Sequence, residues 1–190
     1  MESNIKKDSQ SNDIVLKSAR RILAFSKWIL LAGIGVATIC LLAIPFTYQY
    51  LLAEMAKAFV SPPEPEIFGM IALIMALAVV LMLLTLFAVD RLRRIVRSVG
   101  EGNPFTDING TRLRGIGIAA VGIQIVTFCA SLLATGVVTM LGDPKPGVDF
   151  EMSPDASISI SGILLVLLLI ILARVFDRGA EMQEELDGTV

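Results

Sequence analysis

The chain of 190 residues contains no histidine and only two cysteines, Cys40 and Cys129. Histidine is the commonest general base and metal ligand in proteins, so its absence removes the usual route to acid–base catalysis and to metal binding. The cysteines lie in separate apolar segments without a neighbouring ligand, which favours small buried residues over a metal site. No motif of serine hydrolases, zinc peptidases or phosphate-binding loops occurs. We expect a protein that is not an enzyme and that needs no metal or cofactor.

Charged residues are also scarce, at 18% of the chain, whereas apolar residues make up 55%. Average soluble domains have about 25% charged residues. Four runs carry no charge at all, and they span 26 residues after Lys27, 23 after Glu66, 28 after Arg114 and 18 after Asp155. A membrane-spanning helix needs about 20 mainly apolar residues, and open sheets cannot cross a bilayer. The pattern excludes a soluble enzyme and predicts four spans at about 28–46, 67–89, 115–141 and 158–175.

The expected fold is all-α, an integral membrane bundle of four transmembrane helices with helical cytoplasmic extensions. Residues 28–175 form its single membrane domain, after a partly amphipathic segment at 1–27 and before an acidic tail at 176–190. Residues 90–114 form a helical hairpin, because Leu92, Ile95, Val96 and Val99 recur at helical spacing. The two outer loops should be about 20 and 16 residues long.

Basic residues are distributed unevenly among the segments between the spans. The N-terminal segment and the hairpin carry six each, two follow the fourth span, and the outer loops have only Lys57 and Lys145. Lysine and arginine accumulate on the cytoplasmic side of membrane proteins. With 14 basic residues against two, the sequence predicts a multi-pass protein of the inner (cytoplasmic) membrane with both termini in the cytoplasm.

Two segments carry a family resemblance. The stretch RLRRIVRSVGEGNPFTDINGTRLRGIG resembles the signature of the bacterial membrane proteins catalogued as domain of unknown function 2975 (DUF2975), through Gly102, Pro104, Phe105, Asn109, Arg112, Leu113, Arg114, Ile116 and Gly117. The tail is similar to the family's ending through Phe176, Gly179, Glu184, Glu185, Asp187, Thr189 and Val190, although Gly188 replaces the usual leucine. The four-span pattern extends the resemblance over nearly the whole chain. It implies four helices, no established activity, and a partner, since such proteins are often encoded beside a small helix-turn-helix regulator.

The first functional hypothesis is a non-enzymatic interaction or regulatory protein. It would dock a soluble cytoplasmic partner, for example a small helix-turn-helix regulator, and would not bind nucleic acid itself. The residues expected to contact the partner are Arg93, Arg94, Arg97, Asn109, Arg112, Arg114, Glu181, Glu184 and Glu185. Two other interpretations stay open for these charges: the arginines anchor the helices to anionic lipid, and the acidic face at Glu181 and Glu185 pairs with the hairpin arginines.

The second hypothesis is a small-solute transporter, a channel or a peptide-immunity protein. The third span has polar residues at intervals of three or four, which share one helix face: Gln124, Thr127, Ser131, Thr135 and Thr139. Such a face either packs against a neighbouring helix or lines a pore, and a homo-oligomer could enclose a pore that one bundle cannot. Gln124 is expected to find a hydrogen-bond partner, because an unpaired amide in hydrocarbon costs several kcal/mol.

Overall fold

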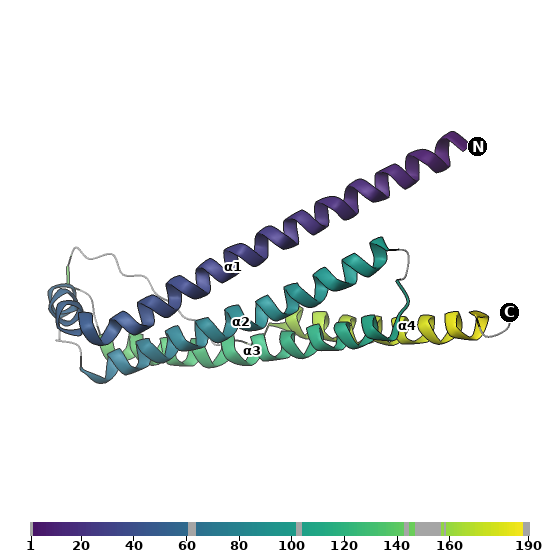
Figure 1. The fold of residues 1–190 in the computed structure, drawn as a ribbon. Helices are drawn as coiled ribbons and strands as arrows, with labels where there is room; N and C mark the ends of the chain where they lie inside the picture. The colour runs from purple at the N-terminus through teal and green to yellow at the C-terminus, as the bar shows by residue number, and fades with distance from the viewer. Residues whose placement is uncertain are drawn as a thin grey trace. The chain divides into compact units, whose positions relative to one another are not determined.

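The computed structural model describes residues 2–60, 64–101, 104–142, 145–146, 157 and 159–187, with the backbone alone at 2–15, Asp107 and Asp187. Its four helices are α1 (Glu2–Ala58), α2 (Glu66–Gly100), α3 (Asp107–Leu141) and α4 (Ile160–Asp187) (Figure 1). Every regular element assigned in the described part of the chain is a helix, which confirms the all-α fold. The outer segment VDFEM at 148–152 lies outside the described residues.

All four helices are long and apolar enough to cross a membrane, with mean hydropathies of 2.2 to 3.0 in their most apolar windows. Their apolar side chains are largely on the surface: Leu164, Leu167 and Leu168 of α4 are each more than half exposed. In water such a surface would aggregate, whereas in a bilayer it contacts lipid tails. The chain is therefore a multi-pass membrane protein built as a four-helix bundle.

The chain divides into two compact units. The hairpin unit comprises Met1–Leu31, Leu84–Gly122 and Ile160–Val190, and it includes the connection between α2 and α3. The loop unit comprises Ala32–Leu83 and Ile123–Ser159, and it includes the other two connections.

In the loop unit, α1 is longer than the sequence predicts. The span expected at 28–46 lies within this helix, which continues to Ala58, so the first part of the expected outer loop is helical. Pro45 lies inside α1, and the last turns run in a different direction (Figure 1). A proline removes one helical hydrogen bond and kinks a helix, yet the leucines and alanines that follow are good helix formers.

Packing also holds these last turns of α1 in place. Met55 and Ala58 contact a buried cluster formed by Phe59, Ile67, Val137 and Leu141. The Lys145 backbone N–H donates to the Ala58 carbonyl at 2.9 Å, and its ammonium donates to the Ala56 carbonyl at 2.9 Å. A cation that binds the free carbonyls at a helix C-terminus stabilises that end. The one basic residue of the second loop therefore caps α1.

In the hairpin unit, α2 continues beyond its uncharged segment to Gly100, as the apolar spacing predicts. Ile95 is buried in a cluster with Leu113 of α3 and Ala173 of α4. Leu92 and Val99 are on the exposed side. The helical extension is therefore present, but of its predicted apolar stripe only Ile95 is buried.

Glycines bring α3 close to α2 in each unit. In the hairpin unit a Cβ atom at Gly115 would lie 3.6 Å from the Phe87 ring, and one at Gly122 would lie 3.2 Å from Leu84 Cδ1. In the loop unit a Cβ at Gly136 would lie 2.7 Å from Met70 Cε. These glycines and Cys129 are spaced by seven residues. Small residues at that spacing allow helix backbones to approach closely in a membrane.

Replacement of Gly122 by leucine is expected to destabilise the protein by about 1–3 kcal/mol, because the larger side chain would collide with Leu84 at a packed interface. The matched control is Gly35→Leu in α1, where a Cβ would meet nothing within 4 Å. Thermal unfolding of the two variants in the same detergent measures the difference. Equal midpoints for both variants would contradict the close approach of α2 and α3.

Candidate functional site

The two segments that carry the family resemblance meet in the hairpin unit. The rings of Phe105 and Phe176 pack with their centroids 5.6 Å apart and a tilt of 48°. Gly179 follows one turn later on α4, and a Cβ there would lie 2.5 Å from the Phe105 ring. Only glycine allows this approach without a shift of the ring. Segments about 70 residues apart in the sequence thus form one contact.

A charged contact lies beside the aromatic one. Arg114 Nη2 of α3 donates to Asp177 Oδ2 of α4 at 2.7 Å. Gly110 lies directly against the same carboxylate, so that any side chain at this position would overlap Asp177. The close approach, rather than a turn, explains a glycine inside the first turns of α3, where it lowers helix propensity.

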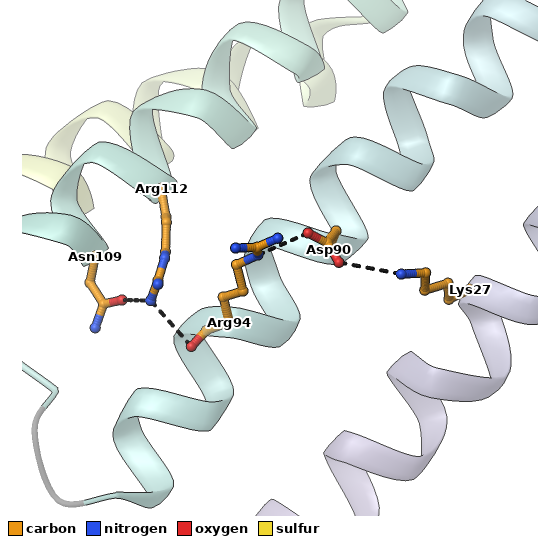
Figure 2. Close-up of polar contacts among 5 residues, drawn as sticks. All are labelled: Lys27, Asp90, Arg94, Asn109 and Arg112. Carbon is orange, nitrogen blue, oxygen red and sulfur yellow. Dashed lines mark hydrogen bonds and ion pairs between the residues drawn. The ribbon is translucent and has the colours of Figure 1, made fainter.

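Asn109 is the polar centre of the hairpin, and its side chain is fully buried. Its amide nitrogen donates to Ser98 Oγ at 2.6 Å and to the Pro104 carbonyl at 2.9 Å. Its amide oxygen accepts from Arg112 Nη1 at 2.9 Å, and the same guanidinium nitrogen reaches the Arg94 carbonyl at 3.4 Å (Figure 2). A buried amide with donor and acceptor atoms both engaged fixes the geometry of its surroundings. Asn109 thereby joins the end of α2 to the start of α3.

An ion pair also joins α1 to α2. Asp90, the first charged residue after the second span, accepts from Arg94 at 2.9 Å and lies 3.5 Å from Lys27 Nζ of α1 (Figure 2). Further along α2, Arg97 donates to Glu101 at 2.8 Å. This hydrogen bond, together with the positive charges of Arg97 and Arg20, lowers the pKa of the Glu101 carboxyl below its ordinary value.

The nine residues predicted to contact a partner differ in exposure. Asn109 is buried and Arg112 is half-buried, whereas the other seven are exposed: Arg93, Arg94, Arg97, Arg114, Glu181, Glu184 and Glu185. Several of the exposed ones also pair within the protein, including Arg94 with Asp90, Arg97 with Glu101 and Arg114 with Asp177. Their role in partner binding stays a prediction.

The expected charge match between tail and hairpin exists, but through another residue. Asp177 contacts Arg114, whereas Glu181 accepts from Arg178 of its own helix at 2.8 Å. Sequence reasoning missed Asp177 and Ser98. Asp177 directly follows Phe176 of the tail motif, and this position was the only feature of the sequence that could have identified it. The family-like residues Gly102, Gly188, Thr189 and Val190 lie outside the described residues.

The polar face of α3 lies in the loop unit and is used mostly for local hydrogen bonds. Thr135 donates to the Ser131 carbonyl at 2.9 Å and Thr139 to the Gly136 carbonyl at 2.8 Å. Thr127 and Ser131 line an open groove of about 280 Å³ whose other walls are apolar residues of α2 and α3. Gln124 Oε1 is buried, and the partner expected for it is absent among the described residues. This groove provides no continuous polar path along the described part of α3.

The expected burial of the cysteines is wrong, since Cys40 and Cys129 are both exposed on their helices. Each lies within an uncharged segment, so its helix presents it towards lipid rather than towards the protein interior. No group of three or more potential metal-binding side chains occurs among the described residues.

Comparison with known proteins gives one match. A family model described as "Protein of unknown function (DUF2975)" matches residues 58–190. This range begins at Ala58, the last residue of α1, and includes α2, α3 and α4, so the family match covers less of the chain than the four-span pattern indicates. No curated protein and no solved structure matches the chain.

Replacement of Asn109 by alanine is expected to destabilise the protein by about 1–3 kcal/mol, because the partly buried Pro104 carbonyl loses its donor. Ile108→Ala is the control, because Ile108 is the adjacent residue and its side chain is exposed. Limited proteolysis of both variants in detergent measures opening of the hairpin near residues 98–109. Cleavage there at the same rate in the two variants would argue against a structural role for Asn109.

Proposed function

The chain belongs to the DUF2975 family of membrane proteins of unknown function, and on that premise we propose that it is a non-enzymatic protein that docks a soluble partner through the tail of α4. The supporting observation is a pair of apolar side chains, Met182 and Leu186, that are 54% and 70% exposed. They lie beyond the uncharged segment that ends before Arg174, so lipid tails would not cover them.

These two side chains form one surface on the tail. They are four residues apart and therefore neighbours on the helix, on the side opposite Ala180, which is buried. Glu181 and Glu185 flank them and are exposed. An amphipathic helix with apolar residues at this spacing is a common ligand for the groove of a partner protein. We define Glu181, Met182, Glu185 and Leu186 as the tail face.

The contacts of the tail support this role. Phe176, Asp177 and Gly179 hold the start of the tail against the hairpin. A helix that is already ordered loses less conformational entropy when a partner binds than a free segment does. The contacts between the two family-like segments thus hold one side of the tail helix against the hairpin. The partner would bind the tail face on the opposite side of this helix.

The charge of the tail favours a basic partner. Glu181, Glu184 and Glu185 are exposed and close together on the helix. Complementary charge increases the rate and the selectivity of association. DNA-binding proteins have basic surfaces, so a small helix-turn-helix regulator has the required charge. Binding would hold such a regulator at the membrane, and its basic surface would no longer be available to DNA.

This function requires the tail to lie in the cytoplasm, and the excess of basic residues in the N-terminal segment, hairpin and tail supports that orientation. Single cysteines at Glu184 and at Glu64, in a chain with Cys40→Ser and Cys129→Ser, test it. A membrane-impermeant maleimide added to intact cells should label Glu64→Cys alone, and permeabilised cells should label both. Labelling of Glu184→Cys in intact cells would place the tail outside and contradict the proposal.

Docking is tested by affinity capture of the tagged full chain from detergent-solubilised host cells. The double variant Met182→Gln, Leu186→Gln should lose a specifically retained basic protein by about tenfold or more, since buried apolar anchors each contribute about 1.5–3 kcal/mol. Ile108→Gln is the apolar control, and Glu64→Gln with Glu66→Gln is a charge control in the loop unit; neither should change retention.

Two results would overturn the docking proposal. The first is capture of no protein in an amount that depends on the tail face. The second is an equal loss with Ile108→Gln, which would indicate general destabilisation of the hairpin unit rather than a docking surface.

A further inference from the structure

We propose that a cavity between α1 and α2 in the hairpin unit binds the phosphate of an anionic phospholipid. This inference goes beyond the docking function and uses other residues. The cavity is open and has a volume of about 480 Å³, and it is lined by Arg20 of α1 and by Asp90, Arg93, Arg94, Arg97 and Glu101 of α2. Its size lies within the range of small-ligand sites, about 300–1,000 Å³.

The charges that line the cavity do not balance. It has four arginines and two carboxylates, which leaves two positive charges unmatched. Asp90 is paired with Arg94 and Lys27, and Glu101 is paired with Arg97. Among the described residues, Arg20 and Arg93 form no ion pair. A guanidinium donates parallel hydrogen bonds that match the oxygens of a phosphate, so these two side chains are the expected direct contacts.

The position of Arg20 depends on a glycine. Gly100, at the end of α2, lies directly against the Arg20 guanidinium, and a Cβ atom there would overlap it. The guanidinium therefore approaches the backbone of α2 from α1 and closes one side of the cavity. Gly100→Ala should displace the Arg20 guanidinium without changing the net charge of the cavity. This variant therefore tests the geometry of the site independently of its charge.

The cavity lies at the depth of lipid headgroups. Lys27 is the last charge before the first uncharged segment, Asp90 is the first after the second, and the two are 3.5 Å apart. This ion pair marks the membrane end of the cavity. From Asp90 to Arg97 α2 rises by about 10 Å, which is close to the depth of a headgroup layer.

The place of the cavity at the ends of two uncharged segments favours a lipid over a free anion. A lipid bound by its phosphate would extend its acyl chains along these apolar segments, whereas inorganic phosphate would not contact them. The chemistry fits phosphatidylglycerol, whose headgroup presents one phosphodiester charge.

Trp28 provides a local probe, because it is the only tryptophan of the chain and is 72% exposed beside Lys27. The full chain is reconstituted in phosphatidylcholine vesicles that contain equal mole fractions of either brominated phosphatidylglycerol or brominated phosphatidylcholine. Brominated acyl chains quench tryptophan on contact. We expect brominated phosphatidylglycerol to quench Trp28 more strongly than brominated phosphatidylcholine does. One hydrogen bond to a charged group corresponds to a binding preference of about tenfold for phosphatidylglycerol.

The variant Arg20→Gln, Arg93→Gln should bring this preference close to one, Gly100→Ala should reduce it, and Arg93→Lys should retain part of it. The control is Arg174→Gln with Arg178→Gln, which removes the same charge from α4 and should leave the preference unchanged. Equal helicity by circular dichroism shows that each variant is folded.

Three outcomes would overturn the lipid site: equal quenching by the two lipids in the parent chain, an equal loss in the α4 control, or loss of the preference when chloride is replaced by inorganic phosphate at constant ionic strength. The last result would assign the cavity to a free phosphate. Failure of this experiment leaves the docking proposal intact, because the tail face shares no residue with the cavity.

Discussion

The absence of water in the bilayer is the constraint on which the rest of this structure depends. Backbone groups inside hydrocarbon must bond to one another, so the four uncharged segments are helices. Apolar side chains then face lipid without cost, and the packing between helices relies on close contact. Gly115 and Gly122 show how this contact is made, since each brings α3 against a large side chain of α2. Charge and buried hydrogen bonding are left to the segments beyond the spans.

In the hairpin unit, polar and aromatic contacts fix the positions of the helices, a role that the burial of apolar side chains has in a soluble domain. Its buried apolar cluster has only three buried members, Ile95, Leu113 and Ala173. Around it, Asn109 satisfies a carbonyl and a guanidinium, while Asp177 and Phe176 fix the tail to α3. A buried amide allows few alternative arrangements, because each of them leaves a donor or an acceptor unpaired. The position of the tail is therefore specified by a small number of side chains.

The sequence predicts the spans, the all-α fold and the helical extension of α2 because each depends on local composition and spacing. It also identifies Asn109, Arg112 and Arg114, which make internal contacts, while their role in partner binding stays a prediction. Pairings between distant segments could not be predicted: no periodicity links Asp177 to Arg114, or Gly179 to Phe105. The end of α1 was missed for another reason. The apolar pattern predicts only the span at 28–46, whereas packing against Phe59 and Ile67 favours a longer helix.

The arrangement of charge gives the two ends of the hairpin unit different chemistry. The cavity on α2 combines basic side chains from two helices next to the membrane surface, where anionic lipids raise the local concentration of their headgroups. The tail is acidic and extends away from the last apolar residues, so the same anionic surface repels it. Repulsion at one end and attraction at the other would hold the tail clear of the lipid. The two proposals are compatible, because lipid bound in the cavity would neutralise arginines that could otherwise attract the acidic tail, and the tail face would stay available to a basic partner.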